Sequence, residues 1–154
     1  MREKAAARDP QRIAGLYNMI VGYGELAMVD AKLGKRAAAL VHCDKATQLL
    51  AQRPPDPDNV DLRVSEAQAY SWLGRTLVQL GTTAPAGEAK RYWRDGREMF
   101  QRALAIWEDL RDRGALAPDD APNLDEAFRE IAKCDAVLAA KANLPGSSFP
   151  NRSH

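Results

Sequence analysis

The stretch DPDNVDLRVSEAQAYSWLGRTLVQLG, residues 56–81, decides the fold because its pattern also occurs earlier in the chain. Similar residues recur at a constant separation of 47 positions, in the pairs Pro10 and Pro57, Tyr23 and Tyr70, Leu26 and Leu73, and Gly34 and Gly81. A fixed internal period is typical of helical repeat arrays, in which each repeat is one helix pair. The sequence therefore predicts stacked helix pairs.

Length and composition favour one all-α domain. The chain has 154 residues, which is enough for one domain with its own core. Charged residues make up 28% of it and leave a formal net charge of +1, so neither a strongly basic nor a strongly acidic surface is predicted. Ala, Leu, Arg and Glu recur, and no segment alternates between apolar and polar residues with period two. Helices are therefore expected between the Pro and Gly residues.

The sequence also gives an expectation for the cellular compartment of the protein. Its two cysteines, Cys43 and Cys134, do not form a Cys-x-x-Cys motif or a disulfide framework. The N-terminus MREKAAARDP lacks the apolar segment of a signal peptide. No apolar run approaches the ~18 residues that a membrane span needs. A soluble, cytoplasmic protein without membrane contact is expected.

Apolar residues at helical spacing, ended by Gly or Pro, predict five helices. We expect each of Gly34, Gly81 and Gly114 to end a helix. The expected helices cover residues 10–33, 35–52, 59–80, 88–113 and 124–142.

These helices divide the chain into two repeats and a cap. Repeat 1 covers residues 10–55, repeat 2 covers residues 56–114, and the helix over 124–142 caps the stack at its C-terminal end. Residues 1–9 are expected to be the end of a preceding helix or an N-terminal tail, in which case the chain is the C-terminal piece of a longer protein. Residues 143–154 are rich in Pro, Ser and Gly and are expected to be disordered.

The second repeat resembles the tetratricopeptide repeat (TPR) family. Tyr70, Leu73-Gly74 and Gly81 stand where the first helix and turn of that family have an aromatic residue, Leu-Gly and a glycine. The second helix of the family has an Ala…Phe…Ala series, which Gly96, Phe100 and Ala103 resemble, with glycine in place of the first alanine.

The first repeat resembles the family less closely, because Ala27 replaces the glycine and Cys43 replaces the aromatic residue. The unit of the family is about 34 residues, shorter than the period here. The longer unit, together with the segment LAIWEDLRDRGAL, is similar to the repeat regions that follow the kinase domain of some bacterial serine/threonine kinases.

This resemblance implies a right-handed stack of antiparallel helix pairs whose first helices line a concave groove. Small, apolar and cationic residues in such a groove can hold an extended peptide or a helix. Reversing the charges of Lys32 and Arg75 by substitution with glutamate is expected to weaken the binding of an acidic partner. An ordinary solvated face is the alternative interpretation. The predicted groove residues are Met28, Lys32, Ser71, Arg75 and Gln79, with Gly24, Ala31 and Val78 at neighbouring positions.

The function expected from this resemblance is a non-catalytic module that binds a peptide or protein partner or acts as a scaffold, with a homodimer as one form. The alternative is a regulatory or dimerising C-terminal tail of a larger enzyme, such as a bacterial serine/threonine kinase. A third possibility is a small enzyme or ligand-binding helical protein, which would need titratable side chains that converge in a pocket.

No catalytic, metal or cofactor site is expected. His42, Cys43 and Asp44 are consecutive, and consecutive residues of a helix point about 100° apart, so these side chains cannot converge. Cys43 and Cys134 lie on apolar faces, where a thiol is an inert core residue. The other histidine, His154, lies in the tail, so no set of metal ligands can be assembled.

A nucleic-acid interface is also not expected. Lys90, Arg94 and Arg97 form a basic run, but nearby acidic residues, including Glu98 in a predicted pair with Arg94, leave too little unopposed charge to bind phosphates.

The three tryptophans are expected in different environments. Trp107 is predicted to lie in the core and Trp72 at a helix–helix seam. Trp93 is predicted to be exposed and to contact a partner or a second copy.

Overall fold

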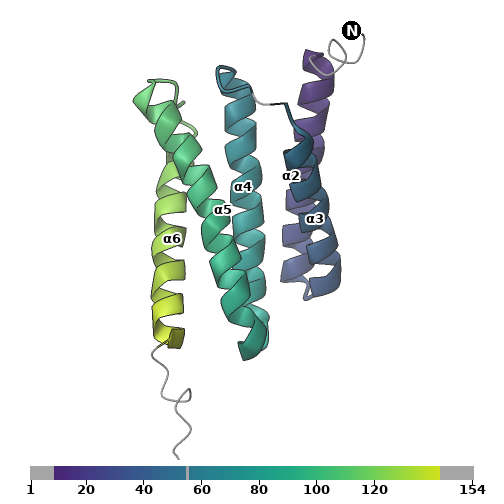
Figure 1. Ribbon diagram of the computed structural model, residues 1–154, viewed down its shortest axis with the longest axis vertical. Coiled ribbons are helices and arrows are strands. Elements are labelled where there is room, and N and C mark those ends of the chain that lie inside the picture. Colours follow the sequence, from purple (N-terminus) through teal and green to yellow (C-terminus); the bar gives the residue numbers. More distant parts are fainter. Residues whose placement is uncertain (1–8, 55, 143–154) are drawn as a thin grey trace, which may run out of the picture.

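The computed structural model describes residues 9–54 and 56–142, which form five α-helices and contain no β-strand. Successive helices run in opposite directions, so that α2, α4 and α6 descend in Figure 1 while α3 and α5 ascend. The all-α prediction is confirmed, whereas the expectations for residues 1–8 and 143–154 lie outside the described residues. The helices are α2 (Pro10–Lys32), α3 (Arg36–Gln52), α4 (Val60–Thr83), α5 (Ala86–Asp112) and α6 (Ala121–Ala142).

Side-chain caps fix the starts of two helices, and two of the predicted glycines mark helix ends. The carboxylate of Asp9 accepts a hydrogen bond of 3.0 Å from the backbone N–H of Gln11, and Asn59 caps α4 by accepting one of 3.1 Å from Leu62. Gly34 and Gly114 follow α2 and α5 with φ of 74° and 70°, a left-handed conformation that favours glycine. The last helix begins at Ala121 rather than at Leu124.

Gly81 does not end a helix, contrary to the prediction. Helix α4 continues to Thr83, and Gly81 lies buried within it. A Cβ atom at this position would lie 2.9 Å from Nε1 of Trp93 on α5. Glycine therefore occurs here because the Trp93 ring packs directly on the α4 backbone.

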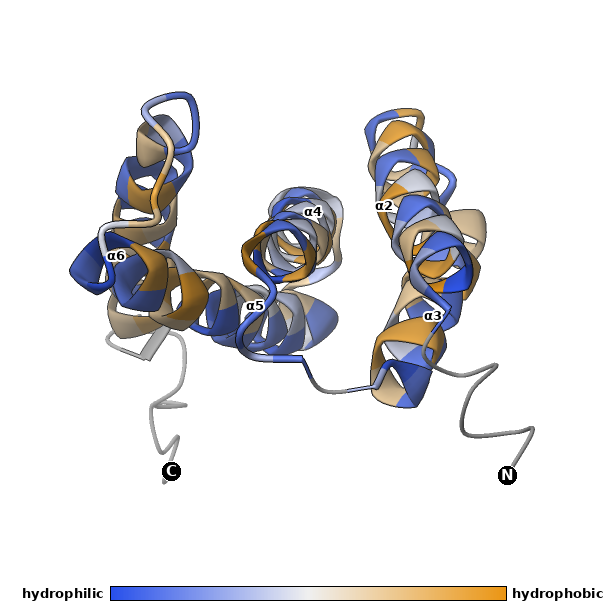
Figure 2. Cartoon of the chain, turned by 90° about the horizontal axis from the view of Figure 1, so that it is seen from above, coloured by the Kyte–Doolittle hydropathy of each residue, from blue (hydrophilic) through white to orange (hydrophobic). Residues whose placement is uncertain are grey.

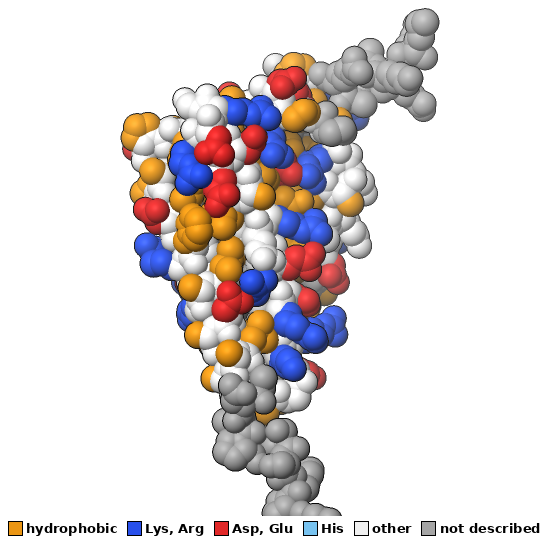
Figure 3. All heavy atoms as spheres, turned by 60° about the vertical axis from the view of Figure 1, so that its left-hand side comes forward, with side chains coloured by type: hydrophobic (Ala, Val, Ile, Leu, Met, Phe, Trp, Pro, Cys, Tyr) orange, Lys and Arg blue, Asp and Glu red, His pale blue; other side chains and the backbone are white. Residues whose placement is uncertain are grey.

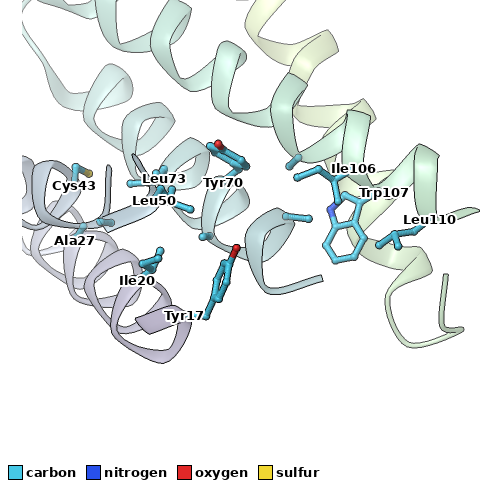
Figure 4. Packing of buried hydrophobic residues seen from close by; sticks show 14 of the residues in the cluster. Tyr17, Ile20, Ala27, Cys43, Leu50, Tyr70, Leu73, Ile106, Trp107 and Leu110 are labelled. Carbon is cyan, nitrogen blue, oxygen red and sulfur yellow. The ribbon is translucent and has the colours of Figure 1, made fainter. Parts of the chain in front are cut away.

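Helix α4 lies at the centre of the molecule. Figure 2 shows it between the α2/α3 pair and helices α5 and α6, and it packs extensively on α2 and α5. The largest core cluster joins all five helices (Figure 4). It is built around these buried side chains: Tyr17 and Ile20 of α2, Cys43 and Leu50 of α3, Tyr70 and Leu73 of α4, Trp107 and Leu110 of α5, and Leu124 of α6.

A second core cluster fixes α6 against α4 and α5. Phe100 of α5 is fully buried and packs on the backbone at Gly74, where a Cβ atom would lie 2.8 Å from the ring. Ala127 and Cys134 of α6 are also fully buried in this cluster, beside Trp93. Glycine at position 74 thus allows α4 and α5 to approach closely enough to enclose a phenylalanine ring.

The aromatic predictions are partly correct. Trp107 is fully buried in the core, and Trp72 lies at the α2/α4 seam, where a Cβ atom at Gly24 would meet it at 2.8 Å. Trp93 was expected to be exposed, but it is buried because Gly81 leaves room for its ring. Phe128 of α6 is 49% exposed.

Candidate functional site

A hollow of about 280 Å³ opens between α2 and α4, beside the start of α6. Its wall combines two apolar side chains with hydrogen-bonding and charged groups, so it can accept an apolar group and bind polar atoms next to it. The hollow is lined by Val21 and Glu25 of α2, by Gln68, Ser71, Trp72 and Arg75 of α4, and by Asn123 of α6.

Ser71 is the most unusual residue of this lining. Its side chain is 2% exposed, and its Oγ atom has no hydrogen-bond partner among the described residues. The hydroxyl of a mid-helix serine usually bonds to the carbonyl four residues earlier, as Oγ1 of Thr76 does with the carbonyl of Trp72 at 2.9 Å. An unsatisfied buried hydroxyl costs free energy. Because the Oγ atom of Ser71 has less than 1 Å² of accessible surface, a ligand in the hollow reaches it only after the Ser71 side chain rotates.

Arg75 is held in place by two neighbours. Its Nε and Nη2 atoms donate to Oε1 of Glu126 on α6 at 3.0 and 2.7 Å, and its guanidinium lies 4.7 Å from the centre of the Trp72 ring. The charge of Arg75 is therefore already matched within the protein. The expectation that Arg75 attracts an acidic partner needs revision, because Glu126 occupies that role.

The structure places the predicted groove residues unequally. Ser71 and Arg75 line the hollow, whereas Met28, Lys32 and Gln79 do not. Met28 and Gln79 are half-buried and Lys32 is exposed. Of the neighbouring positions, Gly24, Ala31 and Val78 are buried in helix packing rather than available to a ligand. Sequence reasoning missed Val21, Glu25, Gln68 and Asn123, of which the first three precede predicted groove positions on the same helices.

A second hollow, of about 340 Å³, lies at the junction of α3 and α4 and contains a cluster of charged side chains. The buried carboxylate of Glu66 forms ion pairs with Arg53 and with Arg63, the latter at 2.9 Å. Arg53 also donates to the backbone carbonyl of Leu50 at 2.6 Å, which ties the end of α3 to α4.

This cluster was missed because its members come from different elements, and only the i, i+3 spacing of Arg63 and Glu66 indicates it in the sequence. Burial, together with the nearby Glu66 carboxylate, raises the pKa of Tyr17, which also lines the hollow. Asp56 adds a second carboxylate to the lining of the hollow. The balanced charges and bonds indicate a structural connection between the two helix pairs.

The His42, Cys43 and Asp44 side chains do not converge. His42 stacks on Tyr23 and its Nδ1 atom lies 2.8 Å from Oδ2 of Asp30 on α2. Cys43 is buried in the core, where desolvation raises the pKa of its thiol to about 12. Burial likewise raises the pKa of Cys134 to about 11. Within residues 9–54 and 56–142, no group of three or more His, Cys, Asp or Glu side chains is arranged to hold a metal ion.

The basic run of α5 lies among acidic side chains. Arg97 pairs with Asp135 of α6, and Arg91 pairs with Asp95 at 3.8 Å. The predicted pair of Arg94 with Glu98 does not form, because Glu98 pairs with Arg102 at 3.0 Å. Figure 3, in which the α6 side comes forward, shows acidic and basic side chains interspersed on that face.

No protein-family model, curated protein or solved structure matches this chain. In the part of the chain that the structure describes, no helix has both the length and the apolar character of a membrane span.

Proposed function

We propose that this chain is a non-catalytic interaction module of TPR-like architecture, which binds an extended peptide segment of a partner protein in the hollow between α2 and α4. The single observation that carries the proposal is the open hollow whose wall places the amide side chains of Gln68 and Asn123 beside the apolar side chains of Val21 and Trp72.

The repeat relation supports the TPR-like part of the proposal. Helices α2 and α4 run in the same direction, and α3 and α5 run in the opposite direction (Figure 1). The hollow lies between positions that are 47 residues apart, such as Val21 and Gln68, or Glu25 and Trp72. A stack of equivalent helix pairs places its first helices side by side and forms its binding surface from them.

The size and chemistry of the hollow favour a peptide over a small molecule. Its volume of about 280 Å³ lies just below the range of about 300–1,000 Å³ that is usual for small-molecule sites. One apolar side chain of a peptide would pack against Val21 and Trp72. The amide groups of Gln68 and Asn123 would bind its backbone. Since Glu126 already neutralises Arg75, we expect an uncharged segment rather than an acidic one.

The test uses peptide display on the full chain, followed by calorimetry of the selected peptides. Val21→Glu introduces a charged, longer side chain into the hollow and is expected to weaken binding at least about tenfold, which is about 1.4 kcal/mol. The matched control is Val41→Glu, the same substitution at a 56% exposed site on α3 outside the hollow. Failure to select any peptide, or equal affinities for the two variants, would overturn the proposal.

A further inference from the structure

Helix α2 carries an apolar stripe that faces away from the core. Four of its side chains are exposed although large and apolar: Met19 by 53%, Leu26 by 50%, Val29 by 53% and Leu33, just after the helix, by 64%. We define the outer stripe as Gly15, Met19, Gly22, Leu26, Val29 and Leu33. Its spacing alternates between four and three residues, as at the core positions of a coiled coil.

The equivalent face of α4 is a helix-packing surface. The position that corresponds to Leu26 is Leu73, which is buried against Cys43 and Leu50 of α3 in the main core cluster (Figure 4). The position that corresponds to Leu33 is Leu80, which is buried with Ala31 and Ala39. On α4 this face is therefore covered by helix packing, whereas on α2 no described residue covers it.

The two glycines of the outer stripe make room for no other part of the chain within the described residues. A Cβ atom at Gly15 or at Gly22 would meet nothing within 4 Å. Glycine is disfavoured inside a helix, so these positions lower the stability of α2 without any compensating internal contact. Glycine does permit another helix to approach closely.

The outer stripe is complementary to itself. If two copies cross antiparallel with a two-fold axis near residue 24, each glycine faces a leucine of the second copy, Gly15 opposite Leu33 and Gly22 opposite Leu26. Met19 then faces Val29. In each of these facing pairs, a small or medium side chain of one copy meets a larger side chain of the other. No charged residue belongs to the stripe. A symmetric dimer requires such a self-complementary patch.

We propose that a second copy of this chain packs antiparallel on the outer stripe to form a symmetric dimer. The stripe spans about 27 Å at a rise of about 1.5 Å per residue. One helix pair of this length buries less than the about 800 Å² per partner of a standard interface, so the dimer is weak and forms reversibly with concentration. This surface is distinct from the hollow, and the Val21→Glu variant leaves it unchanged.

Sedimentation equilibrium of the full chain between about 10 µM and about 1 mM tests the dimer. The wild type is expected to shift from monomer to dimer over this range, and Leu26→Glu is expected to remain monomeric. Phe128→Glu is the matched control, because Phe128 is a comparably exposed apolar residue on α6. A wild-type chain that stays monomeric throughout would overturn the proposal. Dimers that persist in Leu26→Glu would also overturn it.

Gly22→Ala separates dimerisation from folding. In the monomer the new methyl group contacts nothing, so the melting temperature at low concentration is expected to rise by about 2–4 °C. In the dimer the same methyl group pushes against Leu26 of the second copy, so the dissociation constant is expected to increase about tenfold. A dimer as tight as the wild type would contradict the proposed contact.

Disulfide trapping tests the antiparallel register. Gly22→Cys and Leu26→Cys chains are oxidised separately and then as a mixture, with the native Cys43 and Cys134 buried. The proposed register predicts rapid cross-linking only in the mixture, where position 22 of one copy faces position 26 of the other. Efficient cross-linking of either variant alone would indicate a parallel or shifted arrangement and overturn the register.

Discussion

Among single residues, Cys43 has the clearest pH-dependent effect on stability. Burial raises the pKa of its thiol from 9.0 to about 12. The folded chain therefore retains this proton at a pH at which the unfolded chain has lost it. The contribution to stability is complete below pH 9.0 and is lost as the pH rises towards about 12.

We expect Cys43→Ala to reduce the alkaline destabilisation of the protein. Between neutral pH and a pH of about 10.5, the ionisation of the unfolded thiol costs the wild type about 2 kcal/mol that the variant does not lose. Urea unfolding at both pH values measures this difference, and Cys134 and Tyr17 contribute equally to both proteins. Equal losses in wild type and variant would show that the Cys43 thiol is not held neutral by the fold.

For single residues, the sequence shows where an unusual residue such as a recurring glycine stands, but it does not show which structural role that residue has. Gly34 and Gly81 occupy equivalent repeat positions, yet Gly34 has a positive φ and ends a helix while Gly81 makes room for the Trp93 ring. Nothing local distinguishes them, because the difference depends on a side chain of the next helix. The ion pairs of Glu66 with Arg53 and of Arg75 with Glu126 were likewise not predicted, since their partners come from different elements.

For whole helices, the existence and direction of each element could be predicted well. Proline and glycine mark most helix ends, and the apolar spacing identifies the buried faces. The resemblance to the TPR family pointed to the sides of α2 and α4 next to the hollow, but it could not tell how deep each residue lies. Ser71 and Arg75 line the hollow, whereas Met28 and Lys32 of the predicted groove do not.

Two neighbouring residues of α6 provide a sharp test of how this helix packs. Ala127 is fully buried in the cluster with Trp93, and Phe128 is 49% exposed. We expect Ala127→Glu to destabilise the protein by about 3 kcal/mol or more, because it buries an unpaired charge. Phe128→Glu is expected to cost at most about 1 kcal/mol, because about half of the Phe128 side chain is already exposed. Thermal unfolding followed by tryptophan fluorescence measures both. Similar effects of the two substitutions would mean that α6 packs with a different face.

For the whole molecule, the central position of α4 implies unequal local stability. Helix α4 packs on both α2 and α5, whereas the outer stripe of α2 has no cover among the described residues. In a repeat array, terminal units open more easily than internal ones because they have one neighbour rather than two. We therefore expect amide hydrogen exchange of the monomer to be slowest in α4 and α5 and faster in α2 and α3.

The ion pair between Glu66 and Arg53 connects the first helix pair, α2 and α3, to the central helix α4. We expect Glu66→Ala to leave two arginines without their carboxylate and to cost about 2 kcal/mol, less than the about 3–5 kcal/mol of a fully buried pair because both arginines are partly solvated. The loss of amide protection should be larger in α2 and α3 than in α5, because the broken contact lies at their junction with α4. Glu98→Ala is the matched control, since its partner Arg102 lies on the same exposed surface of α5. If Glu66→Ala lowers protection equally in all helices, the chain unfolds as one cooperative unit and the two helix pairs have no separate stability.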